Sequence, residues 1–306
     1  MAPYESDETV QERSVLNRIV RWDKYGIEYE ADPRHSEIII GELGLKGSKA
    51  VVAPGVKVAI NPDDPGEPLS TAESSRFRSL VARANYLAQD RVDIQYAVKE
   101  LTRRMSCPDT HDMIALKRLG RYLVGCPRVV TKYPTQNLPK LIECWVDTDW
   151  AGCVRTRRST SGGGVRVGSH TVKTWAATQA TVALSSGEPE YYGLVKGASQ
   201  ALGMKSLLGD FGIQVKCRVY IYIDSSAAKG IASRMGLGKT RHIAVHLLWV
   251  QEKVRNQEFE LVKCKGTENP ADLMTKHLSQ EVTAEYTDRW GQVFREGRSE
   301  IAPKCL

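Results

Sequence analysis

The chain has 306 residues, of which 42% are hydrophobic and 26% are charged, which is typical of a globular protein and not of a disordered one. No apolar run approaches the roughly 18 residues of a membrane-spanning helix, and the polar, acidic first residues are unlike a secretory signal peptide. The seven cysteines lack CxxC spacing, which argues against a disulfide framework or a zinc knuckle. We therefore interpret them as small buried hydrophobes of an intracellular protein.

Charge is unevenly distributed along the chain. The sequence carries 43 Lys and Arg against 36 Asp and Glu, a net charge of +7, yet residues 1–70 hold only 8 basic and 13 acidic side chains. The basic excess therefore lies in the remainder, as is typical of a protein whose partner is a polyanion such as nucleic acid. A basic domain without such a partner is the alternative.

The sequence pattern of the N-terminal part predicts a mainly helical subdomain. A short strand at 26–30 and a helix over 36–43, capped by Ser36 and stopped by Gly44, precede a linker rich in proline at 53–68. Apolar residues at three- and four-residue spacing then predict helices over 71–105, with a break near 91–93, and over 108–125.

The pattern changes to strands at residue 140. Strands are predicted at 141–147, 162–167, 171–175, 219–223 and 259–263, and helices at 184–208, 227–231, 243–254, from 269, and over 279–297. Three successive strands followed by an alternation of helices and strands predict an α/β domain with a mixed five-stranded sheet and helices on its faces.

Four acidic residues occupy comparable positions in this pattern. Asp147 and Asp224 each end a hydrophobic strand. Glu190 lies in the first turns of the long helix, and Asp272 lies at the start of a late helix. Strand ends and helix starts meet at one edge of such a sheet, and carboxylates that converge there need a cation. Oxygen ligands favour Mg²⁺ or Mn²⁺, and two such ions would activate a water for phosphodiester hydrolysis.

Five segments of this part carry recognisable motifs. They are WVDTDWAG (145–152), RSTSGG (158–163), VALSSGEPEY (182–191), IDSSAA (223–228) and ENPADLMTK (268–276). These motifs resemble the ribonuclease H domain of Ty1/copia-type retrotransposon polyproteins. Upstream, FRSLVARANYLA (77–88), VDIQYAV (92–98) and the 111–124 helix resemble the connection before that domain, and residues 14–56 resemble the end of the reverse transcriptase.

The resemblance implies a division of the chain and a fold. Residues 1–68 would be a remnant of the reverse transcriptase with a linker, and 69–135 a smaller, helical connection subdomain. Residues 138–280 would form a ribonuclease H-like domain, and 281–306 a C-terminal tail helix. No Tyr-x-Asp-Asp motif occurs, so we expect the polymerase site of such elements to be absent from this chain.

The resemblance also implies an activity and its site. The chain would hydrolyse the RNA strand of RNA–DNA hybrids with two Mg²⁺ or Mn²⁺ ions. The metal ligands carried over from the family are Asp147, Glu190, Asp224 and Asp272. The implied partners are a hybrid or other nucleic acid and the polymerase part of a reverse transcriptase. No membrane is expected, and the compartment, a cytoplasmic particle or the nucleus, stays open.

Two acids compete with this assignment, Asp149 with Asp147 and Glu188 with Glu190, and we expect the competitors to be caps or supporting groups. Pro189 stands where the family usually has alanine. It is tolerated in the first turn of a helix that starts at Ser186, whereas an earlier start would displace Glu190.

Five basic residues are candidate contacts to nucleic-acid phosphates: Arg155, Arg157, Arg158, Lys239 and Arg241. A solvated basic loop is the alternative for the three arginines. The function has a rival as well, namely a catalytically inactive relic that binds nucleic acid or a polymerase partner.

Overall fold

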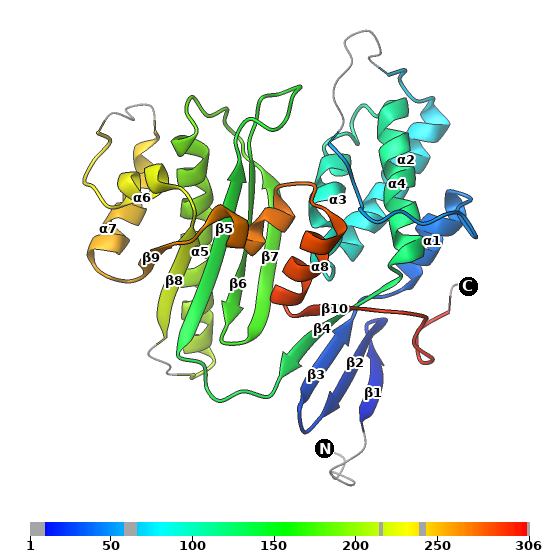
Figure 1. Cartoon of the computed structure of the whole chain (residues 1–306), viewed down its shortest axis with the longest axis horizontal. Coiled ribbons are helices and arrows are strands. Elements are labelled where there is room, and N and C mark those ends of the chain that lie inside the picture. The colour runs from blue at the N-terminus through cyan, green and yellow to red at the C-terminus, as the bar shows by residue number, and fades with distance from the viewer. Residues whose placement is uncertain (1–9, 58–65, 214–216, 239–242, 305–306) are drawn as a thin grey trace. The chain divides into compact units, whose positions relative to one another are not determined.

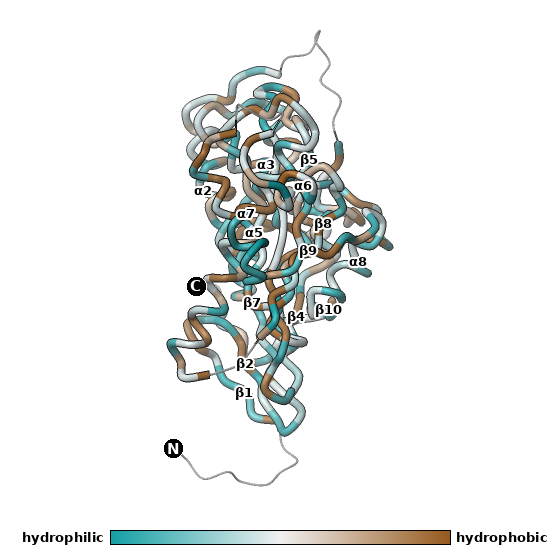
Figure 2. Tube along the Cα trace, turned by 90° about the vertical axis from the view of Figure 1, so that its left-hand side faces the viewer, coloured by the Kyte–Doolittle hydropathy of each residue, from teal (hydrophilic) through white to brown (hydrophobic). Residues whose placement is uncertain are grey.

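The computed structural model describes residues 10–57, 66–213, 217–238 and 243–304. It divides the chain into two compact units, the first unit (residues 1–135 and 277–306) and the second unit (residues 136–276). Each unit has its own five-stranded sheet (Figure 1). Hydrophobic and hydrophilic residues alternate along the tube in Figure 2, as expected of elements that bury one face. Within the described ranges, no helix combines the length and the apolar character needed to cross a membrane.

The sheet of the first unit is antiparallel, with the order β1-β2-β3-β4-β10. Its strands are Gln11–Val15 (β1), Arg18–Asp23 (β2), Gly26–Glu30 (β3), Arg128–Pro134 (β4) and Gln292–Arg295 (β10). Buried Glu30 joins three of them, because Arg21 of β2 lies 2.9 Å and Arg128 of β4 lies 2.7 Å from its carboxylate. Burial opposes the charge of Glu30, but the two guanidinium groups outweigh it and lower its pKa.

This sheet differs from the sequence prediction, which expected one strand here and a tail helix over 281–306. The predicted tail helix exists but is shorter than expected, because α8 (Gln280–Arg289) ends before Gly291, whose φ of 73° stops the helix, and β10 follows. The strands β1 and β2 were missed. They are joined at Leu16 and Asn17, with φ of 50° and 65°, a hairpin geometry that alternating hydrophobicity does not reveal. The structure divides the chain after Lys276, and it groups the predicted subdomain 69–135 with residues 1–68 and 277–306 in one unit.

Four helices of the first unit pack around one apolar core. They are α1 (Arg34–Glu42), α2 (Thr71–Leu87), α3 (Gln95–Thr102) and α4 (Thr110–Gly125), with a 3₁₀ helix at Val92–Ile94. Reciprocal capping boxes start two of them, Ser70 with Glu73 before α2 and Asp109 with Asp112 before α4. The buried side chains of this core include Ile39, Phe77, Leu80, Leu116 and Leu119.

The second unit confirms the predicted mixed five-stranded sheet. Its strands are β5 (Leu141–Asp149), β6 (Thr160–Val167), β7 (His170–Thr178), β8 (Arg218–Ile223) and β9 (Glu260–Lys263), in the order β7-β6-β5-β8-β9. The first three pair antiparallel, whereas β8 runs parallel to both β5 and β9. The sheet therefore places the ends of β5 and β8 side by side (Figure 1).

One long helix packs on this sheet and fixes the geometry of its central strand. The helices of the unit are α5 (Gly187–Asp210), α6 (Ser226–Ala232) and α7 (Trp249–Arg255), with 3₁₀ helices at Val245–Leu248, Gly266–Glu268 and Pro270–Met274. Close packing of α5 on β5 depends on Gly197, where a Cβ would lie 2.4 Å from Cγ1 of Val146.

Two glycines of α5 should respond oppositely to alanine. In Gly197→Ala the added methyl group meets Val146, and we expect the free energy of unfolding to fall by about 1–2 kcal/mol because overpacking exceeds the gain in helix propensity. A Cβ at Gly203 has no atom within 4 Å, so Gly203→Ala should gain about 1 kcal/mol. Denaturant unfolding measures both, and a gain in both variants would contradict the close approach of α5 to β5.

Candidate metal centre

Three carboxylates from three elements converge in the second unit. Asp147 lies near the end of β5, Asp224 directly follows β8, and Glu190 lies in the first turn of α5. One ligand oxygen of each lies within 4.8 Å of the others, an arrangement that could hold a metal ion. Because β5 and β8 are parallel, with Trp145 opposite Tyr222, the two aspartates leave the sheet at the same edge.

The start of α5 positions Glu190. The helix begins at Gly187, so Pro189 is its third residue, where a backbone N–H has no acceptor within the helix. The Pro189 carbonyl accepts hydrogen bonds from the Thr148 hydroxyl at 3.3 Å and the Gln179 amide at 2.9 Å. The helix therefore starts late enough for Pro189 to lie in its first turn, as the sequence analysis required, and the proline does not displace Glu190.

The fourth predicted acid, Asp272, lies beside the three clustered acids. It belongs to the 3₁₀ helix Pro270–Met274, which Asn269 caps by accepting the N–H of Ala271 at 3.1 Å. The Asn269 side chain has no exposed surface and also donates to the carbonyl of Val146 at 2.9 Å. The amide thus ties the segment that carries Asp272 to β5, one residue before the first acid of the cluster.

Two residues that sequence reasoning did not single out contact these acids. The hydroxyl of Thr275, which has no exposed surface, donates to Oδ2 of Asp147. The Nζ atom of Lys276 lies 2.8 Å from Oδ1 of Asp272 and 3.4 Å from Oδ2 of Asp147. Both stand in the segment that ends the ENPADLMTK motif, so their place in that motif was the available signal.

Gathering these acids in a partly buried site raises the pKa values of three of them. Burial and then the charges of Asp147 and Asp224 raise the pKa of Glu190 to about 9. Burial and Asp147 raise the pKa of Asp272 to about 7, and they raise that of Asp224 as well. Burial opposes the charge of Lys276, but Asp147 and Asp272 outweigh it and raise its pKa. Additional positive charge would let the carboxylates ionise together.

The two competing acids have other contacts. The carboxylate of Asp149 lies directly against Gly152, where a Cβ would overlap it, in the loop after β5. Glu188 is buried, and its oxygens accept the N–H of Leu184 at 2.7 Å and the hydroxyl of Tyr192 at 2.5 Å. Glu188 therefore holds the chain that leads into α5.

The predicted phosphate contacts are partly described. Arg155, Arg157 and Arg158 are exposed in the loop between β5 and β6, and Arg157 has a φ of 54°. Lys239 and Arg241 lie outside the described residues. The structure thus presents three exposed guanidinium groups on the connection that follows the strand of Asp147.

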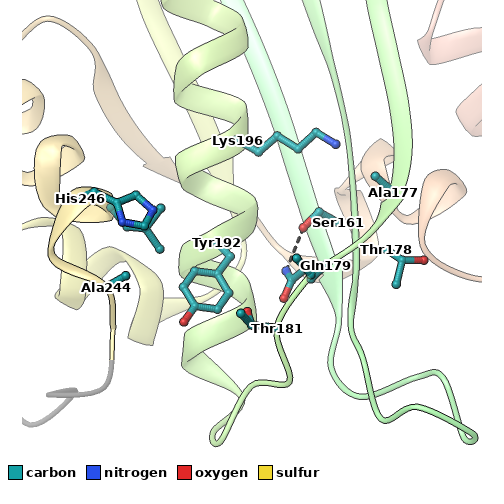
Figure 3. A pocket seen from close by; sticks show the side chains of 11 residues that line it. Ser161, Ala177, Thr178, Gln179, Thr181, Tyr192, Lys196, Ala244 and His246 are labelled. Carbon is teal, nitrogen blue, oxygen red and sulfur yellow. Dashed lines mark hydrogen bonds between the residues drawn. The ribbon is translucent and has the colours of Figure 1, made fainter.

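A cavity of about 350 Å³ opens beside α5 (Figure 3). Tyr192 and Lys196 of α5 line it together with Ser161 of β6 and Gln179. The Gln179 amide donates to Oγ of Ser161 at 2.8 Å, the dashed line in Figure 3, and also to the Pro189 carbonyl. One wall of the cavity therefore helps to hold the backbone at the start of α5.

Comparisons with known proteins find transposon polyproteins among the relatives of the chain, although no protein-family model matches it. It is 30% identical over 220 residues to the Retrovirus-related Pol polyprotein from transposon RE1 of Arabidopsis thaliana, covering 72% of this chain and 15% of that protein. It is 28% identical over 210 residues to the one from transposon TNT 1-94 of Nicotiana tabacum, covering 68% and 15%. It is also 34% identical over 170 residues to the uncharacterized mitochondrial protein AtMg00810 of A. thaliana, covering 55% and 68%. The chain thus spans about 15% of the length of the two polyproteins.

The hydroxyl of Thr275, which donates to Asp147, should contribute to metal affinity. Thr275→Val removes the donor with little change in shape, and we expect Mn²⁺ to bind about 10-fold more weakly, because groups that orient a ligand carboxylate contribute on this scale. Thr275→Ser keeps the hydroxyl and should bind nearly as the wild type does. Isothermal titration calorimetry measures the dissociation constants, and equal values for the valine variant and the wild type would refute the role.

The stability of the metal-free protein should depend on pH through Glu190. Its pKa is raised from 4.5 to about 9 in the folded state, so its stabilising contribution is complete below about pH 4.5 and is lost as the pH rises through 9. In chelator, the Tm of the wild type should therefore fall over this range more steeply than that of Glu190→Gln. Mg²⁺ should reverse the trend in the wild type. Parallel Tm curves for the two proteins in chelator would speak against the shift.

Proposed function

The chain belongs to the Ty1/copia-type retrotransposon Pol family, and on that premise we propose that its second unit is a ribonuclease H that hydrolyses the RNA strand of RNA–DNA hybrids. The observation that carries the proposal is the convergence of Asp147, Glu190 and Asp224. They come from β5, the start of α5 and the end of β8 of a mixed sheet, which is the order in which the resemblance places the family's acids.

A divalent cation fits the residues present. The three clustered side chains offer carboxylate oxygens, the ligands that Mg²⁺ and Mn²⁺ prefer. Asp147 is buried and the other two are half-buried. Burial, and after it the charge of the neighbouring carboxylates, raises the pKa of Glu190 and of Asp224, and a cation would neutralise that charge. We therefore take Mg²⁺ or Mn²⁺ as the cofactor.

The chain's own residues prepare the reaction. When bound, the divalent metal would activate the attacking water and stabilise the leaving oxygen of the phosphodiester. Asp147, Glu190 and Asp224 would hold it, with the carboxylate of Asp147 kept in place by Thr275. The hydrogen bond from Gln179 to the start of α5 keeps Glu190 in reach of the other two acids.

Substrate recognition would come from two kinds of contact. The exposed residues Arg155, Arg157 and Arg158 would bind backbone phosphates of a nucleic acid, and the basic excess of the chain supports this role. Selection of RNA would depend on its 2′-hydroxyls in the minor groove of the hybrid. We further propose that residues 69–135 connect this activity to the polymerase part of a reverse transcriptase.

Cleavage of a labelled RNA–DNA hybrid in Mg²⁺ tests the proposed function. Asp224→Asn removes one ligand charge and should lower the cleavage rate by a factor of about 100 or more, the scale on which a charge-stabilising group contributes. The fold should persist, because the substitution removes a negative charge that is costly to bury.

Asp149→Asn is the matched control. Asp149 is an acid of the same strand as Asp147, but its carboxylate lies against Gly152 and outside the clustered group, so cleavage should stay close to the wild-type rate. A folded wild type that binds the hybrid in a salt-dependent manner and does not cleave it would replace the enzyme by a nucleic-acid-binding relic.

A further inference from the structure

One tryptophan close to the candidate metal centre is exposed. All six tryptophans of the chain lie in the described ranges, and only Trp150 is exposed, with 51% of its surface accessible. Trp145 of the same segment instead stacks on Tyr222, with ring centroids 3.9 Å apart, and Trp175 is buried. No ring or cation of the described residues packs on the Trp150 indole. The aromatic face of Trp150 is therefore open to a partner.

The turn that carries Trp150 is held by its own contacts. The carboxylate of Asp149 occupies the place that a Cβ at Gly152 would need, so only glycine fits there. Ala151 has a φ of 53°, and its N–H donates to Oγ of fully buried Ser159 at 3.0 Å. The backbone on both sides of the indole is thus fixed before a partner binds, which lowers the entropy cost of a contact made through it.

Exposed apolar and basic side chains occur together at this sheet edge. The loop after β5 exposes Val154, and the loop before α5 exposes Val182 and Leu184. The two loops are joined where the N–H of Gln179 donates to the carbonyl of Ser159 at 2.8 Å. The exposed arginines of the first loop are Arg155, Arg157 and Arg158. Exposed apolar side chains among polar or charged ones mark an interaction site.

The partner that fits this combination is a nucleic acid. Arginines bind backbone phosphates, and an exposed indole stacks on bases, which offer a π-face whatever their identity. A protein partner would need acidic side chains to meet the arginines and an apolar surface to cover the indole, whereas one nucleic-acid strand supplies both anions and rings. The net charge of +7 favours the same partner.

The place of Trp150 in the chain limits where on the nucleic acid its contact falls. Trp150 is the third residue after Asp147, and three residues of extended chain span at most about 11 Å. Successive nucleotides of one strand are about 3.4 Å apart along a duplex. An indole that reaches a base from this turn therefore lies within a few base steps of the phosphodiester at the metal centre.

We propose that Trp150 enters the minor groove of the RNA–DNA hybrid, stacks on a base within a few steps of the cut, and so selects the step that is cleaved. The proposal rests on the proposed function. The minor groove is the accessible one, because the major groove of an A-form helix is too deep and narrow for side chains to read. A wedge in the minor groove partly unstacks one base step, at a cost that depends on its sequence. Trp150 is then a specificity-determining residue.

Binding of a labelled hybrid by the full chain in chelator tests the stacking without cleavage. Trp150→Ala should bind about 10-fold more weakly than the wild type, and Trp150→Phe, which keeps a ring, within about 3-fold of it. The slope of log affinity against log salt should be unchanged in Trp150→Ala, because stacking releases no counterions. Arg157→Ala should reduce that slope by about 1. Equal affinities of Trp150→Ala and the wild type, or a reduced slope in Trp150→Ala, would overturn the proposal.

Tryptophan fluorescence gives a direct signature of the contact. Stacking on a base should quench the emission of the wild type when hybrid is added, and Trp150→Phe should lose this quenching. Trp22→Phe, the matched control, removes a half-buried tryptophan of the first unit and should keep the quenching. Quenching that survives in Trp150→Phe would contradict the proposal.

The cleavage pattern separates this inference from the proposed function. On a hybrid of mixed sequence in Mg²⁺, the wild type and Trp150→Phe should prefer the same steps, and Trp150→Ala should lose these preferences. Cleavage by the wild type with affinity and pattern unchanged in Trp150→Ala would overturn the stacking and leave the ribonuclease standing. The predicted quenching and affinity difference without cleavage would do the reverse. Trp150→Leu, apolar but without a π-face, replaces the alanine variant if that one does not fold.

Discussion

Carboxylates that are partly buried side by side repel one another, and much of the second unit holds them together against that repulsion. Parallel pairing of β5 and β8 brings Asp147 and Asp224 to one sheet edge. Hydrogen bonds from Thr148 and Gln179 fasten the start of α5, which carries Glu190. The fold therefore maintains a site whose metal-free form is electrostatically unfavourable, and a cation or bound protons must offset the cost.

The acids of the site could be predicted from the sequence because strand ends and helix starts are readable from hydrophobic periodicity. The separation of Asp272 from the other three could not, since it depends on the cap made by Asn269 and on the reach of one lysine. Lys276 carries a signal only through its place in the ENPADLMTK motif, because a lysine after a short helix is usually a solvated surface residue. Only the tertiary position of its backbone turns it toward Asp147.

The fold was predictable to different degrees in the two units, for a physical reason. Apolar strands such as β8 bury one face completely and the other in part, and they stand out in the sequence. In the first unit, β3 was predicted from its alternation, whereas β1 buries none of its residues and β2 buries only Ile19, so neither shows an apolar stripe. Sequence reasoning recognises strands with a buried apolar face and misses strands that bury few side chains.

The first unit is discontinuous, which bears on how the chain folds during synthesis. Its strand β10 pairs with β4, with Arg295 opposite Arg128, although the whole second unit lies between the two strands in the sequence. A ribosome therefore releases all of residues 136–276 before it makes the strand that completes the earlier sheet. Until then β4 has an open edge, the kind of surface that recruits strands from other chains. The first unit thus begins first and is completed last. Nascent chains are most exposed to mispairing of β4 at the stage when the second unit, which carries the candidate metal centre, is already complete.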